Sequence, residues 1–453
     1  MLIRFNVQNV FSFAESEEFN MLPRPKIRTP EGHKYALDGI ELLKLSAIYG
    51  ANAAGKSNLI NALGLLQGLV TGKISSLTIQ EKRFKFEPAA HESQMMAAEF
   101  VQDGSAYYYG VEINSGEIIT EELYRSGLGK KSDTLLFERK KLDNGKTGIT
   151  FSEVFEKDPA SQLIKSVLVE DFLEKSRSAI PWLAKRGNQH LSEVKSAMTW
   201  FEKTLQIITP QTRPAALTMW LESDSSVNSF AQDTLRAYGL GISRVDVREK
   251  PFEEVVGGEA DKMLNALRDK FSDHDDAFLV MPSTNGGELV FVKKNDTFVV
   301  KNAKFTQSDN EGNEAEFDLD ELSDGTRRLL DFMPAFRDIV LNRKVYVVDE
   351  LERSMHPVIA KELISKFSRD TDTKGQLIFT THESNLLDQS IFRQDEIWFA
   401  EKGPMGNTSL YSLSDFKEHN TIDIRKGYLN GRYGAVPFTA DLQELNWHQY
   451  ETN

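Results

Sequence analysis

Four residues of one short stretch have the types and spacing needed to hold a chain of phosphate groups. Gly50 and Gly55 enclose four residues and are followed by Lys56 and Ser57, which gives the pattern G-x-x-x-x-G-K-S. Glycines at both ends permit a tight loop whose backbone N–H groups surround the phosphates. Lys56 would reach the β- and γ-phosphates, and the Ser57 hydroxyl would ligate Mg²⁺. The pattern therefore predicts a binding site for a nucleoside triphosphate, ATP, with Mg²⁺, rather than a chance glycine-rich turn.

A second stretch supplies the carboxylates that such a site needs. The apolar run Val345-Tyr346-Val347-Val348 ends at Asp349 and Glu350. A strand of this kind, after a phosphate-binding loop, delivers an aspartate to the Mg²⁺ shell, and Asp349 is assigned that role. Glu350 would polarise a water molecule for in-line attack on the γ-phosphate. The alternative, an acidic helix start after a strand, is disfavoured because the phosphate-binding loop is present.

The elements around both stretches fit these roles. Residues 43–49 are apolar enough for a buried strand, and 58–66 have apolar residues at helical spacing. The glycine loop therefore leads from a strand into a helix whose positive dipole end faces the phosphates. Near the N-terminus, residues 1–13 predict a strand, and 18–22 predict its hairpin partner. From 84 to 139, short β-like runs separated by turns predict an antiparallel meander.

A segment with helical periodicity separates the two stretches. Apolar residues recur at spacings of three and four over 161–205, and further helices are predicted over 226–238 and 259–271. Strands resume at 277–280 and 288–292, and the acidic run 309–324 indicates a solvated loop. The predicted fold class is α/β: a P-loop ATPase head, with a mixed central sheet and a β-meander, interrupted by a helical domain. The expected divisions are 1–150, 151–275 for the insertion, and 276–453.

Composition narrows the class of protein. The 453 residues include no cysteine, which excludes disulfides, thiolate zinc sites and cysteine nucleophiles. No apolar run approaches the length of a membrane span, and the N-terminus lacks the features of a signal peptide, so a cytoplasmic protein without membrane contact is expected. The formal net charge of −14 argues against a surface built as a whole for nucleic acid, and leaves room for a local basic groove.

Three further stretches resemble the ordered motifs of ABC-type ATPases. The run 322–326, Leu-Ser-Asp-Gly-Thr, resembles their signature sequence, with Asp324 in place of the first glycine of LSGG. Residues 351–357 resemble the D-loop region, and the strand 377–381 ends at His382, as at the switch histidine of the family. The resemblance implies that Ser323 and Gly325 contact the γ-phosphate held by a second subunit, and that His382 touches the γ-phosphate. No convincing Q-loop glutamine is found; Gln80 and Gln94 are the candidates.

Taken together, four segments resemble one bacterial group, the OLD-like ATPases of ABC type that accompany nucleases in phage-defence operons. The ATPase subunits of PARIS-type systems (AriA-like) and abortive-infection ATPases are the nearest members. The segments are 9–13, the loop Gly-x-Asn-x-x-Gly-Lys-Ser-Asn at 50–58, 349–357 and 432–437. Through the loop, the resemblance adds Asn52 and Asn58 to the expected nucleotide-binding residues. It covers both ends of the chain but not the helical middle.

The resemblance also implies partners. It implies a homo-oligomer with composite ATP sites, a separate Toprim-type nuclease effector and a phage-encoded trigger. OLD enzymes carry the Toprim domain after the ATPase, and residues 383–453 are too few for a domain of that kind. Nuclease activity is therefore expected from a partner. The expected function is a slow ATPase that acts as sensor and scaffold, and whose nucleotide state holds or releases the effector.

Two other functions fit parts of the sequence. A DNA-repair or DNA-tethering ATPase would need a basic surface, for which 82–85 (Lys-Arg-Phe-Lys) and Arg343-Lys344 are the suggestive clusters. Salt-dependent DNA binding by the isolated protein would favour that function. A small-molecule phosphotransferase is disfavoured, because the signature serves composite sites and no acceptor-binding motif appears.

Overall fold

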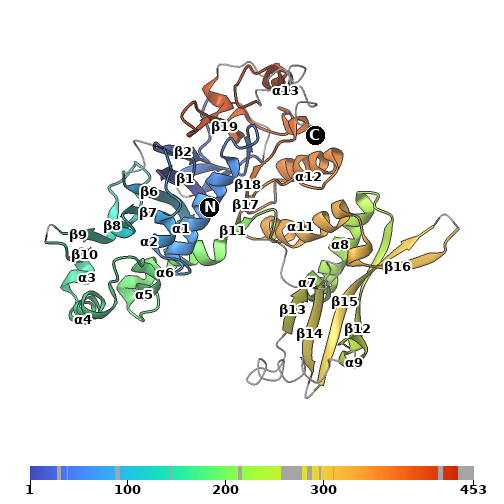
Figure 1. Cartoon of the computed structure of the whole chain (residues 1–453), viewed down its shortest axis with the longest axis horizontal. Helices are drawn as coiled ribbons and strands as arrows, with labels where there is room; N and C mark the ends of the chain where they lie inside the picture. The colour runs from blue at the N-terminus through green and yellow to red at the C-terminus, as the bar shows by residue number, and fades with distance from the viewer. Residues whose placement is uncertain are drawn as a thin grey trace, which may run out of the picture. The chain divides into compact units, whose positions relative to one another are not determined.

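The chain forms two units, which Figure 1 traces from the N- to the C-terminus. The computed structural model describes residues 1–27, 32–37, 39–86, 92–142, 144–212, 217–256, 278–282, 288–294, 297–309, 311–416 and 422–436. Unit 1 comprises Met1–Thr209, Ile339–Leu351 and Lys361–Asn453, and unit 2 comprises Pro210–Asp338 and Glu352–Ala360. These divisions differ from the expected 1–150, 151–275 and 276–453, because the helices that follow residue 151 pack within unit 1.

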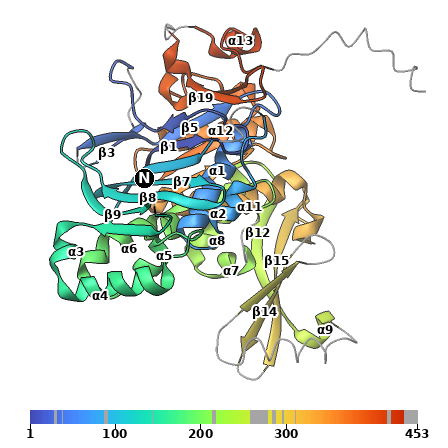
Figure 2. The ribbon, with the colours of Figure 1, turned by 60° about the vertical axis from the view of Figure 1, so that its left-hand side comes forward.

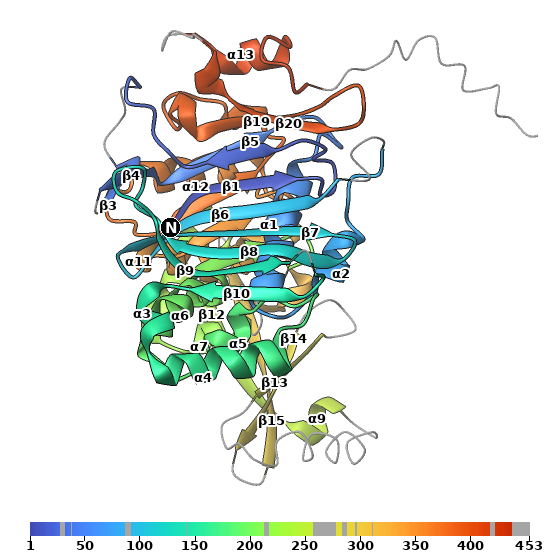
Figure 3. The same cartoon turned by 90° about the vertical axis from the view of Figure 1, so that its left-hand side faces the viewer.

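An antiparallel sheet in unit 1 contains the predicted meander (Figure 3). Its order is β10-β9-β8-β7-β6-β1-β2. The strands are β1 (Leu2–Gln8), β2 (Glu17–Asn20), β6 (Gln94–Gln102), β7 (Ser105–Asn114), β8 (Glu117–Arg125), β9 (Thr134–Lys141) and β10 (Thr147–Phe151). The predicted N-terminal hairpin is present, with Phe5 opposite Phe19 and both side chains buried. Alternation along β1 places Phe5 and Val7 in the core, and Leu2 joins them because the strand has an irregularity between Leu2 and Arg4.

A mixed sheet in the same unit carries the candidate site. Its order is β11-β17-β18-β5-β19-β20, and only the β19–β20 pair is antiparallel. The strands are β5 (Leu45–Tyr49), β11 (Leu205–Ile208), β17 (Val345–Val348), β18 (Gln376–Thr380), β19 (Ile397–Lys402) and β20 (Thr408–Ser412). Every residue of β5 and β18 is buried, as expected for inner parallel strands. The carboxyl ends of β17, β18 and β5 therefore meet at one edge of the sheet.

Helices and one hairpin complete unit 1. The predicted helix after the glycine loop is α1 (Lys56–Val70), whose apolar face belongs to the main core. The others are α2 (Ser76–Gln80), α3 (Glu153–Lys157), α4 (Pro159–Val167), α5 (Ile180–Leu183), α6 (Ser192–Thr199) and α13 (Ile424–Leu429), and the hairpin is β3 (Lys34–Leu37) with β4 (Ile40–Leu43). Helix α12 (Pro357–Arg369) begins in unit 2 and continues into unit 1 from Lys361. No helix in the described ranges is long and apolar enough to cross a membrane.

The predicted helical run 161–205 is broken into short pieces that lie beside the β9–β10 end of the meander (Figure 2). Two of its turns are π-helical, at Leu168–Phe172 and Trp200–Thr204. Trp200 is fully buried and stacks on Phe100 of β6, with ring centroids 4.2 Å apart. Aromatic spacing in this run therefore reflects packing against the meander.

Buried charges also join this helical segment to the meander. The side chains of Glu121 in β8 and Arg139 in β9 are both 0% exposed. A guanidinium nitrogen of Arg139 lies 3.4 Å from a carboxylate oxygen of Glu121. Glu121 accepts hydrogen bonds from the Ser178 hydroxyl at 2.5 Å and from the Ala179 N–H at 3.1 Å. Arg139 donates to the Arg177 carbonyl at 2.6 Å. Each buried charge thus has partners on both sides of the junction.

Unit 2 is built on a sheet of order β12-β15-β14-β13, with β16 paired to β15 (Figure 1). Its strands are β12 (Ile242–Pro251), β13 (Phe278–Pro282), β14 (Glu288–Lys294), β15 (Thr297–Ser308) and β16 (Glu314–Asp318). Its helices are α7 (Leu217–Glu222), α8 (Ser225–Ala237) and α9 (Phe252–Val256), and α11 (Asp324–Leu341) begins in it. The predicted helix 226–238 corresponds to α8.

Two predictions for unit 2 need correction. Residues 242–251 of the expected helical insertion form strand β12, which pairs with β15 along its whole length. The acidic run expected to be a solvated loop contains β16, which pairs with β15 along its whole length. Lys304 pairs with Asp318 at 2.8 Å, and Arg248 pairs with Glu316 at 2.5 Å. Cations on the neighbouring strands thus compensate the carboxylates. The predicted helix 259–271 lies outside the described residues.

The buried pair gives a prediction about stability. Glu121→Ala leaves Arg139 buried without its carboxylate, so we expect the free energy of unfolding to fall by about 3–5 kcal/mol. Urea denaturation measures this loss, and hydrogen exchange should increase in residues 174–184. Glu117→Ala is the matched control, because Glu117 of the same strand is 31% exposed and pairs with the exposed Lys141 and Lys175. Equal effects of the two substitutions would contradict the role of the buried pair.

Candidate nucleotide-binding site

The loop between β5 and α1 needs both of its glycines. A Cβ at Gly50 would lie 2.4 Å from the carbonyl oxygen of Ala400 in β19. Gly55 has a φ of 106°, and a Cβ there would lie 2.1 Å from the Thr408 hydroxyl oxygen of β20. No side chain fits at either distance, so the β19–β20 hairpin packs directly on the loop backbone.

Lys56 is the first residue of α1, and its side chain reaches back into this loop; the residue is 5% exposed. Its ammonium donates to the carbonyls of Gly50 at 2.9 Å and Ala51 at 3.1 Å. The same nitrogen lies 3.5 Å from Nδ1 of His382. Residues 326 positions apart in the chain therefore meet at the loop, because β18 lies directly beside β5.

The predicted Mg²⁺ ligands are in contact. The Ser57 hydroxyl, at the start of α1, donates to a carboxylate oxygen of Asp349 at 3.0 Å. The Thr380 hydroxyl, at the end of β18, donates to the same oxygen at 2.6 Å. Asp349 is buried, and its backbone N–H bonds to the Ile208 carbonyl of β11 at 2.8 Å. The carboxylate is therefore held on several sides beside the first turn of α1.

Glu350 has an unusual backbone conformation. Its φ is 50°, a left-handed value that costs a non-glycine residue about 1–3 kcal/mol. The Glu350 N–H donates to the Thr380 hydroxyl at 2.8 Å, which helps to hold this conformation. Thr380 thus positions both carboxylate residues. Sequence reasoning assigned this threonine no role.

One pocket of about 370 Å³ contains most of the predicted residues. Predicted residues among its lining are Asn52, Gly55, Lys56, Ser57, Asn58, Glu350 and His382. Gly50 and Asp349 do not line it, although their partners Lys56 and Ser57 do. Ser12, Lys402 and Gly406 also line the pocket and were not predicted. Five separate parts of the chain therefore contribute to its wall, at residues 12, 52–58, 350, 382 and 402–406.

Ser12 and Thr408 hold the loop from the side. The Ser12 hydroxyl oxygen accepts from the Asn58 amide at 2.8 Å and from the Thr408 hydroxyl at 2.7 Å. Thr408 also contacts the Ala54 carbonyl at 2.9 Å, and its N–H bonds to the Ser12 carbonyl at 2.7 Å. The sequence signal for Ser12 was its place in the 9–13 motif. Nothing in the sequence marked Thr408 or Lys402.

A second pocket of about 310 Å³ adjoins the first and shares Ser12, Asn58 and Gly406 with it. Glu81 and a set of aromatic and basic residues make up the rest of its wall: Phe11, Phe84, Phe86, Lys82, Arg83 and Lys85. The Phe84 and Phe86 rings are 5.5 Å apart at their centroids. The Asn9 side chain accepts from the Phe84 N–H at 3.1 Å and so fixes this segment beside the N-terminal turn.

The signature residues lie in unit 2 and do not line the pocket. Ser323 precedes α11, and its hydroxyl oxygen accepts from the Thr326 N–H at 3.2 Å, as a helix cap does. A Cβ at Gly325 would lie 2.7 Å from the Ser354 carbonyl oxygen, so the signature packs closely on the predicted D-loop. This contact explains the glycine without involving a ligand.

The two candidate Q-loop residues are absent from the pocket wall. Gln94 is buried at the start of β6, and its amide donates to the Ile79 carbonyl at 2.9 Å. That hydrogen bond gives Gln94 a structural role between β6 and α2.

The charges around His382 determine its protonation. Burial lowers the pKa of His382 below the ordinary histidine value, and the neighbouring Lys56 ammonium lowers it further. Glu350 and Asp349 act in the opposite direction and do not cancel these effects. At neutral pH the imidazole is therefore uncharged, and one of its nitrogens can accept a hydrogen bond.

A titration tests this arrangement. We expect the pKa of His382, measured by NMR on histidine-labelled protein, to lie below that of an exposed histidine. Lys56→Ala should raise this pKa, because it removes one of the two causes, but not fully, because burial remains. His382→Gln assigns the resonance. A midpoint at or above the ordinary value in the nucleotide-free protein would contradict the described environment.

One family model and several solved structures are similar to this chain. A family model described as "AAA domain, putative AbiEii toxin, Type IV TA system" matches residues 45–388. No curated protein matches the chain. Among solved structures, the SMC head domain from Thermotoga maritima is 13% identical, with a TM-score of 0.37 and coverage of 91% of this chain and 98% of that one.

Two further structures are similar at the same low level. An SmcHead bound to the C-winged helix domain of ScpA is 13% identical, with a TM-score of 0.41; the match covers 91% of this chain and 97% of that one. A Pyrococcus furiosus Smc head with an extended coiled coil, bound to the C-terminal domain of ScpA, is 11% identical, with a TM-score of 0.38 and coverage of 95% and 98%. The family model spans the glycine loop, the Asp349-Glu350 pair and His382, which is most of the chain. The protein therefore belongs to the AAA-domain family whose description names a putative AbiEii toxin of a type IV toxin–antitoxin system.

Proposed function

We propose that the pocket at the end of β5 binds ATP with Mg²⁺ and hydrolyses the ATP. The observation that carries the proposal is the 3.0 Å contact between Ser57 and Asp349, in a site where Lys56 and Glu350 line the pocket. Membership of an AAA-domain family supports ATPase activity. The loop N–H groups and the Lys56 ammonium would hold the phosphates, in exchange for the carbonyls that Lys56 contacts now.

The residues present suit a magnesium ion. Within the described ranges no group of three or more histidine, aspartate or glutamate side chains could hold a metal by itself. Mg²⁺ in ATPases takes one or two protein oxygens, and phosphates and waters complete its shell. Ser57 and Asp349 supply two such oxygens. When bound, the ion would neutralise charge on the β- and γ-phosphates.

Glu350 and His382 suit the hydrolytic step. The Glu350 carboxylate would accept a proton from the attacking water while the bond from the γ-phosphorus to the leaving oxygen breaks. Neutral His382, beside Lys56, would hydrogen-bond the γ-phosphate. The adjoining pocket suits the base and ribose, because Phe84 and Phe86 offer ring surfaces next to basic side chains.

The signature residues support a composite site in a homo-oligomer. Ser323 and Gly325 at the start of α11 would contact the γ-phosphate bound by a second copy of the chain. Nucleotide occupancy would then control assembly, because ATP would stabilise the assembled state preferentially.

Two substitutions test the chemistry. Glu350→Gln should retain ATP binding but slow hydrolysis by about 10²–10⁴-fold, because the proton acceptor is lost, and ATP should then accumulate in a larger oligomer. Lys56→Ala should weaken ATP binding at least about tenfold, because the phosphates lose a charge partner. Phosphate release measures the hydrolysis rate, calorimetry measures the affinity for ATP, and light scattering measures the size of the oligomer.

Exposed side chains provide the matched controls for these two substitutions. Glu362→Gln on α12 and Lys73→Ala after α1 should leave the affinity for ATP and the rate of ATP hydrolysis unchanged. Hydrolysis at the wild-type rate in Glu350→Gln would exclude Glu350 as the base. Normal ATP affinity in Lys56→Ala would exclude the assigned loop.

At the level of biology, we propose a cytoplasmic sensor and scaffold of anti-phage defence, in the manner of PARIS-type (AriA-like) ATPases. The chain would hold a separate Toprim-type nuclease and release it on a phage-encoded trigger. The toxin–antitoxin system in the family description supports a two-component arrangement. DNA tethering is less well supported, because Lys82, Arg83 and Lys85 line the pocket beside the phosphate-binding loop.

Co-purification tests the scaffold role. Tagged protein expressed from its native operon should bring down a nuclease in stoichiometric amount, identified by mass spectrometry, and Glu350→Gln should change the amount retained. A single chain that instead retains DNA in a salt-dependent manner would favour the tethering function.

A further inference from the structure

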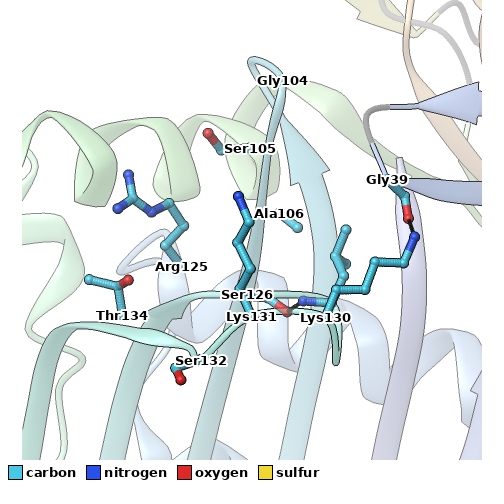
Figure 4. Close-up of a pocket in the computed structure, with 12 residues that line it drawn as sticks. Gly39, Gly104, Ser105, Ala106, Arg125, Ser126, Lys130, Lys131, Ser132 and Thr134 are labelled. Carbon is cyan, nitrogen blue, oxygen red and sulfur yellow. Dashed lines mark hydrogen bonds between the residues drawn. The ribbon is translucent and has the colours of Figure 1, made fainter.

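A third pocket, of about 500 Å³, lies in unit 1 at one end of the meander and shares no lining residue with the site described above (Figure 4). Three turns enclose it: the β3–β4 turn at Gly39, the β6–β7 turn at Gly104, and the β8–β9 connection over 126–133. Its wall is polar. The cations Arg125, Lys130 and Lys131 and the hydroxyls of Ser105, Ser132 and Thr134 contribute to it.

The charge of this pocket is positive, although the protein as a whole carries a net charge of −14. No aspartate or glutamate is among the lining residues. Figure 4 shows Lys131 extending toward Ser105, Arg125 with its guanidinium turned away from Lys131, and Lys130 turned to the Gly39 carbonyl. Arg125 contacts Glu193 at 3.3 Å. In the described part of the chain the Lys131 ammonium has no ion-pair partner.

Nearby carboxylates are engaged elsewhere. Asp133 accepts from the Gly127 N–H at 2.8 Å. Glu99 pairs with Arg4 at 2.8 Å and accepts from the Ser126 hydroxyl at 2.5 Å. These acids stabilise the turn and the sheet, and neither is among the residues of the pocket wall.

The turn that presents Lys131 is fixed by its backbone. Leu128 and Gly129 have φ values of 56° and 67°, and a Cβ at Gly127 would lie 2.0 Å from the Lys131 carbonyl oxygen. The N–H groups of Lys130 and Lys131 both donate to the Gly127 carbonyl, at 3.0 and 3.1 Å. A tightly closed turn of this kind holds a binding residue in place before the ligand arrives.

We propose that this pocket binds a phosphate group carried by a ligand of about nucleotide size. A guanidinium and a lysine ammonium in the wall of a hydroxyl-lined cavity match the charge and the acceptor oxygens of a phosphate. The cavity is larger than a single phosphate needs, so it has room for the organic part of the ligand. The proposal does not depend on the ATPase assignment.

Inorganic pyrophosphate is a suitable probe, used with the full-length Lys56→Ala chain so that the loop at β5 does not compete. Calorimetry should detect one saturable site, and Lys131→Gln or Arg125→Gln, each added to Lys56→Ala, should raise the Kd about tenfold. Lys140→Gln is the matched control, since Lys140 of the next strand is exposed and paired with Glu138 at 2.7 Å. Lys140→Gln should change the Kd for pyrophosphate by no more than about twofold.

Lys131 and Arg125 are both exposed, so substitution of either should preserve the fold. The absence of saturable binding, or equal affinity in the Lys131→Gln and Lys140→Gln proteins, would overturn the proposal. Competition identifies the source of the phosphate. Displacement of pyrophosphate by a mononucleotide indicates a small ligand, and displacement only by a single-stranded oligonucleotide indicates a nucleic-acid backbone.

Discussion

The candidate site depends on the parallel pairing of β18 with β5 on one side and with β17 on the other. Leu377 pairs with Leu45, and Gln376 pairs with Val345. In this register the glycine loop, the Asp349-Glu350 pair and His382 leave neighbouring strands at one edge. A slip of one residue would reverse the side-chain directions, because the side-chain period of a strand is two. The 3.0 Å contact of Ser57 with Asp349 depends on that register.

Residues outside the loop make it rigid. The β19–β20 hairpin packs against Gly50 and Gly55, where no Cβ fits, and Thr408 joins this hairpin to Ser12 and Ala54. Ser12 belongs to the N-terminal turn, whose Phe11 N–H donates to the Lys82 carbonyl at 2.6 Å. The loop, the turn, the hairpin and the basic-aromatic segment therefore form one hydrogen-bonded assembly. Support of this kind fixes the positions of groups that contact a ligand.

Unit 1 places its polar groups differently at two positions along the β8–β9 pair. Around Glu121 and Arg139 opposite charges are buried together and join the helical segment to the meander. Around Arg125 and Lys131 cations line an open cavity without carboxylates in its wall. The first arrangement is complete within the chain, whereas the second leaves charge available to a ligand.

The amino-acid sequence by itself determined the features that depend on residues close together in the chain. The glycine loop lies between a buried strand and a helix, and the carboxylate pair ends an apolar strand, because these features depend on residues close together in the chain. The meander was predictable for the same reason, through alternation and turn residues.

Tertiary structure decided the features that depend on distant partners. Strand β12 forms because it pairs with β15, some fifty residues later, and β16 forms because it pairs with the same strand, where Lys304 and Arg248 lie beside its carboxylates. Thr380, Thr408 and Lys402 join the site only through folding, since an isolated threonine or lysine carries no sequence signal. Helix and turn propensities act over a few residues, but strand pairing and side-chain hydrogen bonds join residues hundreds of positions apart.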